Sequence, residues 1–160
     1  MNRLSSIGSY LKKLYRTYSQ ELLSSLQNKG FTDLRPSFLE VLLYICENEG
    51  SSIKEVGKNC GLKKQTMTSH LNELEKRGYT SRRINPNDRR EQNIFLTDYG
   101  QKFKFSLLEA INEIEEKYCS VLGRIELERI DHVLKNFHEK ISDEPYKGVK
   151  PLTLFSSSAG

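Results

Sequence analysis

The chain has 160 residues, of which 36% are hydrophobic and 29% charged, and its net charge is +4. This length suits one domain with a helical extension, and no apolar run reaches the roughly 18 residues that span a bilayer. The N-terminus also lacks the apolar region of a secretory signal, so we expect a cytoplasmic protein without membrane contact.

The sequence carries no recognisable catalytic or cofactor motif. It has no Gly-rich phosphate loop, no nucleophile elbow and no clustered histidines or carboxylates, so we expect no enzyme activity and no cofactor. Cys46, Cys60 and Cys119 are odd in number and widely spaced, which argues against a disulfide framework and a structural zinc site. His132 follows Glu128 at a metal-ligating spacing, but further ligands are missing, and an exposed or capping histidine is favoured.

The chain begins with an amphipathic helix predicted over residues 4–28. Its apolar residues recur at steps of three and four: Leu4, Ile7, Leu11, Leu14, Tyr18, Leu22 and Leu26. Such a long helix at the start of a small protein needs another chain to bury it. Pro36 suits the first turn of a second helix, over 36–48, which is apolar on most sides and therefore central.

A helix-turn-helix pattern follows. Ser52 and Glu55 form a capping-box signature for a short helix over 53–60, and Gly61 closes it before another helix at 64–77. The exposed side of this second helix carries short polar and basic groups that suit a DNA major groove, although a plain solvated surface has the same composition. The candidate DNA contacts here are Lys63, Lys64, Gln65, Thr66, Thr68 and Ser69.

Two β-prone segments, 79–84 and 92–96, flank an Asn-Pro-Asn-Asp turn at 85–88, which predicts a hairpin. Arginines surround its tip, and adjacent phosphates or a narrow minor groove explain them better than solvent does. These candidate DNA contacts are Arg82, Arg83, Arg89 and Arg90. Asp88 is expected to orient one of them. Residues 62–90 hold eight basic against three acidic residues, a local charge of +5, which a solvated charged face would also give.

Helices are predicted to complete the chain. Thr97 is a good N-cap, Gly123 interrupts the apolar stripe that follows, and a coiled-coil-like seam then runs through Leu127, Ile130, Leu134, Phe137 and Ile141. The composition beyond residue 142 is typical of a flexible tail.

The expected fold is mainly α with a small β-wing, a winged helix-turn-helix domain flanked by long dimerisation helices. Its predicted parts are a dimerisation helix at 1–30, a DNA-binding region at 31–100, dimerisation helices at 101–141 and a tail at 142–160.

This arrangement resembles the MarR family of winged-helix transcriptional regulators. The resemblance rests on residues 74–79 (Leu-Glu-Lys-Arg-Gly-Tyr), 82–90 with the wing arginines, and 96–100 (Leu-Thr-Asp-Tyr-Gly). It implies a homodimer that presents two winged helices to a pseudo-palindromic double-stranded DNA site, and repression relieved by a small ligand or an oxidant.

The resemblance also implies a ligand pocket between the dimerisation helices and the winged helix. A small aromatic ligand there would meet Tyr15, Tyr18, Phe31, Phe38 and Tyr44, each of which is equally an ordinary core candidate. Redox sensing through a cysteine is an alternative, but relatives that sense peroxide use a cysteine near the first helix, and this chain has none before Cys46. A second alternative is a winged helix that associates with an acidic protein and not with specific DNA.

Overall fold

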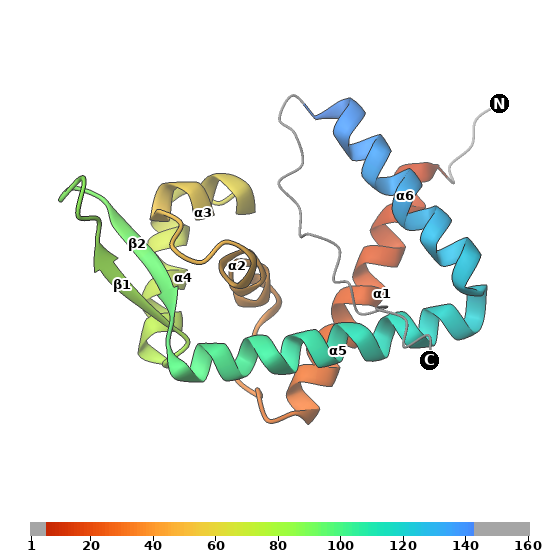
Figure 1. Cartoon of the computed structure of the whole chain (residues 1–160), viewed down its shortest axis with the longest axis horizontal. Coiled ribbons are helices and arrows are strands. Elements are labelled where there is room, and N and C mark those ends of the chain that lie inside the picture. Colours follow the sequence, from red (N-terminus) through yellow and green to blue (C-terminus); the bar gives the residue numbers. More distant parts are fainter. Residues whose placement is uncertain (1–5, 143–160) are drawn as a thin grey trace, which may run out of the picture. The chain divides into compact units, whose positions relative to one another are not determined.

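The structure is a computed structural model that describes residues 6–142. Within them the chain forms six helices and one two-stranded antiparallel sheet, which confirms the predicted mainly α fold with a β-wing (Figure 1). Of the tail predicted from residue 142 onward, all but Ser142 lies outside the described residues.

The elements follow the predicted order closely. They are α1 (Ile7–Asn28), α2 (Pro36–Glu47), α3 (Ile53–Cys60), α4 (Lys64–Lys76), β1 (Thr80–Ile84), β2 (Gln92–Leu96), α5 (Asp98–Leu122) and α6 (Arg124–Ile141). The helix predicted over 64–77 ends one residue early because Arg77 is already its C-cap.

The two helices of the helix-turn-helix are fixed by local signals. In the capping box before α3, the Glu55 amide donates to Ser52 Oγ at 3.1 Å and the Ser52 amide donates to Glu55 Oε2 at 3.3 Å. Gly61 ends α3 with a φ of +64°, a left-handed conformation that glycine adopts without strain. Met67, Leu71 and Leu74 then bury one face of α4, which leaves its opposite face to solvent.

The wing pairs β1 with β2 in a register that sets Thr80 opposite Leu96 and Ile84 opposite Gln92. A short segment between α2 and α3 lies on the other edge of β2. There the Gly50 amide donates to the Ile94 carbonyl at 2.8 Å, and the Ile94 amide donates to the Ser51 carbonyl at 2.9 Å. This pairing was not predicted, because one bridge is too short to leave an alternating pattern in the sequence. It anchors the wing to the helix-turn-helix.

An aromatic cluster joins the end of α4 to the start of α5. Tyr79 is fully buried, with its ring centroid 5.0 Å from Tyr99 and 5.5 Å from Phe103, and Phe31 completes the cluster. Burial, together with its hydrogen bond to Asp33, raises the pKa of the Tyr79 phenol, so its hydroxyl stays protonated and donates to Asp33 Oδ1 at 2.8 Å. These contacts fix the path of the chain between α4 and α5.

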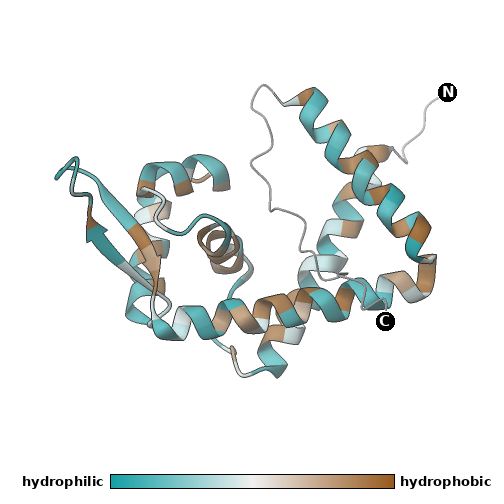
Figure 2. Ribbon diagram, in the orientation of Figure 1, coloured by the Kyte–Doolittle hydropathy of each residue, from teal (hydrophilic) through white to brown (hydrophobic). Residues whose placement is uncertain are grey.

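The chain divides within α5 into two compact units, one ending at Glu115 and the other beginning at Glu116. The second unit contains α6, in which no residue is buried, although apolar residues alternate with polar ones along the helix (Figure 2). None of the helices in residues 6–142 combines the length and hydropathy needed to cross a membrane.

Candidate nucleic-acid interface

The outer face of α4 carries all six predicted contacts of this helix on exposed positions. Lys63 is its N-cap residue, and Lys64, Gln65, Thr66, Thr68 and Ser69 follow in the first two turns. Within residues 6–142, the side chains of Gln65, Thr66 and Ser69 have no hydrogen-bond partner, so their donors and acceptors stay available. The Thr68 hydroxyl, in contrast, donates to the Lys64 carbonyl at 2.8 Å and offers only its lone pairs outward.

The wing tip is a closed loop that displays two arginines. The backbone amide of Asn85 donates to the backbone carbonyl of Glu91 at 2.9 Å. The Asp88 carboxylate accepts from the backbone amide of Arg90 at 3.0 Å. Arg89 and Arg90 are exposed, and neither guanidinium has an ion-pair partner in the described part of the chain. The tip therefore presents two positive charges on a loop whose backbone is held by its own side chains.

The two arginines of β1 differ from those at the tip. Arg82 is half-buried and turns to α4, where its Nε lies 3.0 Å from Glu75 Oε2 and its Nη2 donates to Asn72 Oδ1. The guanidinium of Arg83 lies 4.2 Å from the centre of the Phe95 ring, a cation–π contact that holds it against the hairpin. Arg82 thus links the wing to α4, a role that the sequence did not indicate because the partners come from different elements.

Arg77, a member of the basic cluster in the sequence, also makes its contacts within the protein. Its Nε is 3.4 Å from Glu73 Oε2, and its Nη1 is 3.7 Å from Asp33 Oδ2. It further donates to the Asp33 carbonyl, and its guanidinium lies 5.0 Å from the centre of the Phe38 ring. Two of the eight basic residues in 62–90 are therefore neutralised by partners in the protein, Arg77 and Arg82.

The five aromatic residues considered for a ligand pocket occupy different environments. Phe31 and Phe38 are buried in the core of the winged helix. Tyr44 is half-buried, and its hydroxyl accepts from Asn59 Nδ2 at 3.0 Å. On α1, Tyr15 is exposed and Tyr18 half-buried.

The cysteines and histidines offer no reactive or metal-binding cluster in residues 6–142. Burial raises the pKa of the Cys46 thiol to about 12 and that of the Cys60 thiol to about 11, which disfavours the reactive thiolate. Cys119 is half-buried. His132 Nε2 lies 3.0 Å from Asn136 Nδ2, one turn along α6.

Known proteins match both the sequence and the fold. A model of the MarR family matches residues 32–91. The HTH-type transcriptional regulator SarZ of Staphylococcus aureus (strain MRSA252) is 32% identical over 148 residues, covering 88% of this chain and 97% of SarZ. The HTH-type transcriptional regulator TtmR of Methylorubrum extorquens (strain PA1) is 42% identical over 69 residues, which cover 43% of this chain and 35% of TtmR's own length.

Solved structures share the fold. The transcriptional repressor CouR, bound to a 23-mer DNA duplex, superposes with a TM-score of 0.70 at 23% identity, covering 85% of this chain and 99% of CouR. The likeness extends from the winged helix to the flanking helices, because the match covers most of both chains.

Proposed function

The chain belongs to the MarR family of DNA-binding transcriptional regulators, and on this premise we propose that it is a homodimeric repressor that a small ligand releases from a pseudo-palindromic operator. The observation that carries the proposal is the pairing of a polar, exposed α4 face with a wing tip where the guanidinium groups of Arg89 and Arg90 have no ion pair among the described residues. The helix would choose the sequence, and the wing arginines would supply affinity from a minor groove. Lys63, Lys64 and Arg83 would hold phosphates.

The homodimer is supported by apolar surface that is exposed in the described part of the chain. On α6 the seam residues Ile130, Leu134, Phe137 and Ile141 are all exposed, and the N-terminal half of α1 exposes Ile7 and Leu14. Exposed apolar stripes of this length mark association surfaces. Two copies related by a two-fold axis would present their α4 helices about 34 Å apart, which corresponds to a pseudo-palindrome of roughly 16–20 bp.

Repression is supported by CouR, whose name describes a repressor on DNA. We propose that release from DNA is caused by a small aromatic ligand that contacts the exposed ring of Tyr15 and the neighbouring Tyr18 on α1. Phe31 and Phe38 are left out because they are buried in the core.

Selection of duplexes from a random pool tests the function directly. The full chain should enrich a two-fold symmetric site, sediment as a dimer at micromolar concentration, and lose affinity steeply as salt rises. A small-molecule screen on the selected duplex then tests release. Binding that is insensitive to salt and does not distinguish the selected duplex from a scrambled one would favour the protein-association alternative.

A further inference from the structure

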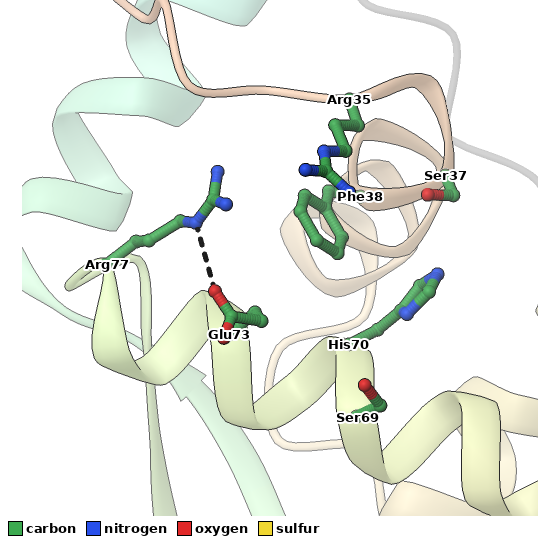
Figure 3. A pocket seen from close by; sticks show the side chains of 7 residues that line it. All are labelled: Arg35, Ser37, Phe38, Ser69, His70, Glu73 and Arg77. Atoms are coloured by element: carbon green, nitrogen blue, oxygen red, sulfur yellow. Dashed lines mark hydrogen bonds and ion pairs between the residues drawn. The ribbon is translucent and has the colours of Figure 1, made fainter.

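A polar pocket lies where the start of α2 meets the middle of α4. Seven residues line it: Arg35, Ser37, Phe38, Ser69, His70, Glu73 and Arg77 (Figure 3). Ser69 also belongs to the outer face of α4, so the pocket is continuous with the surface expected to face DNA. We propose that this pocket holds a backbone phosphate of the DNA duplex, with Arg35 as its ligand, an inference that rests on the DNA-binding function proposed above.

Among the charged groups that line the pocket, Arg35 has no ion pair within the described residues. Arg77 is already paired with Glu73 and Asp33, so these three groups sum to a charge of −1, which the charge of Arg35 brings to zero. Arg35 is exposed, and among residues 6–142 its guanidinium has no ion pair. Its guanidinium lies 6.0 Å from the centre of the Phe38 ring. An unpaired guanidinium over a pocket suits an oxyanion, because its N–H groups match the spacing of phosphate oxygens.

Phe38 gives the pocket a rigid floor. It is 5% exposed and sits beneath the guanidiniums of Arg35 and Arg77, while His70 meets it edge-on with ring centres 5.0 Å apart. Cation–π contact limits the rotamers of both arginines. Ser37 and Ser69 also line the pocket, and their hydroxyls have no hydrogen-bond partner within the described residues, so both could donate to a phosphate oxygen.

The position of the pocket around α4 indicates which phosphate it would meet. Glu75 pairs with Arg82 of the wing, whereas Glu73 lines the pocket, and two residues apart on a helix means about 160° apart around its axis. Wing and pocket therefore flank the exposed face of α4 on opposite edges. A helix inserted in a major groove has a sugar–phosphate strand on each side. The pocket would bind the sugar–phosphate strand on the side of α4 opposite to the wing. The two contacts together would set how deeply α4 enters the major groove.

The test uses the full chain and a duplex selected from the random pool, with affinity measured over a range of KCl. Arg35→Gln should weaken binding to the selected and to a scrambled duplex by a similar factor, roughly tenfold at low salt, and should reduce the logarithmic salt slope by about one. Lys102→Gln removes the same charge from an exposed position on α5 and should change neither quantity. Matched thermal melts of both variants confirm that the fold is intact.

Replacing single phosphates by neutral methylphosphonates identifies the contact. One position per half-site should weaken the wild type and leave Arg35→Gln unaffected, since the variant has already lost that contact. The phosphate site would be overturned if Arg35→Gln and Lys102→Gln had the same DNA affinity and salt slope. It would also be overturned if each methylphosphonate weakened the wild type and Arg35→Gln by the same factor. Failure of the wild type to bind any duplex would instead overturn the proposed function itself.

Discussion

Arg82 Nε on β1 lies 3.0 Å from Glu75 Oε2 on α4, so an ion pair joins the wing to this helix. Arg82 Nη2 also donates a hydrogen bond to Asn72 Oδ1, which adds another contact between the wing and α4. The pair is partly buried on the arginine side, and its residues are held by two different elements, so it fixes the wing relative to α4. Arg82 would then act on DNA through the geometry of the wing and not as a phosphate ligand.

The sign of the effect of Glu75→Gln distinguishes these roles. If Arg82 positions the wing, Glu75→Gln should weaken specific DNA binding by roughly fivefold to tenfold, because it breaks the pair at a cost of about 1 kcal/mol. If Arg82 binds phosphate, the same substitution should strengthen binding, because it removes a negative charge near DNA and frees the arginine. Fluorescence anisotropy with the selected duplex measures the change. Exchanging the two residues, Glu75→Arg with Arg82→Glu, should restore part of the affinity only in the first case.

The wing tip should contribute through Arg90 and through the backbone bond that Asp88 makes to it. Arg90→Ala should weaken specific binding by about 1–3 kcal/mol if the side chain enters a groove. Asp88→Asn retains an acceptor for the Arg90 amide and removes a negative charge, so it should bind at least as tightly as the wild type. Asp88→Ala loses the acceptor and should bind more weakly. Unchanged affinity for both Arg89→Ala and Arg90→Ala would remove the wing from the interface.

The α6 seam should control the oligomeric state. Leu134→Glu places a charge in the middle of the exposed apolar stripe and should shift sedimentation at micromolar concentration toward a monomer, with loss of affinity for the full pseudo-palindrome. Lys135→Glu places the same side chain on the adjacent polar position and should remain dimeric. A dimer that persists in Leu134→Glu would exclude this part of α6 from the interface.

Gly100 should be indispensable where α5 passes the start of β1. A Cβ at this position would lie 2.1 Å from the Tyr79 carbonyl oxygen and 3.1 Å from Leu96 Cβ, so both backbones would have to move. Gly100→Ala should therefore lower the free energy of unfolding by about 1–3 kcal/mol in urea titrations. Gly8→Ala is the matched control in α1, where the nearest atom is Ser6 Oγ at 3.8 Å, and it should leave stability unchanged or slightly raised.

Cys60 should behave as an unreactive thiol at neutral pH. Because burial raises its pKa to about 11, the thiolate fraction at pH 8 is about one in a thousand and grows tenfold for each pH unit up to the pKa. In a Cys119→Ser background, the rate of labelling by a disulfide reagent should follow this rise, with mass spectrometry locating the label. Mild peroxide should leave DNA affinity unchanged. A labelling rate that levels off near pH 7 would revive the redox alternative.

Local signals in the sequence were sufficient for the helices, the hairpin and the choice of which side of α4 is exposed. Capping residues act on their own turn of backbone, as Ser52 and Glu55 do before α3, and Thr97 caps α5 by accepting from the Gly100 amide at 3.0 Å. Apolar periodicity then indicates which face of each helix is buried. These interactions join residues within about one helical turn, so a single sequence contains all the information they need.

Only the tertiary structure decided which charges remain available to DNA. Arg77 and Arg82 looked equivalent to Arg89 and Arg90 in the sequence, yet within residues 6–142 the fold pairs the guanidinium groups of the first two with carboxylates and leaves those of the second two without an ion pair. Likewise, Arg35 and Arg77 come together over Phe38 only when α2 packs on α4. Coulomb interaction depends on distance in space, and residues 42 positions apart in the chain become neighbours only after folding.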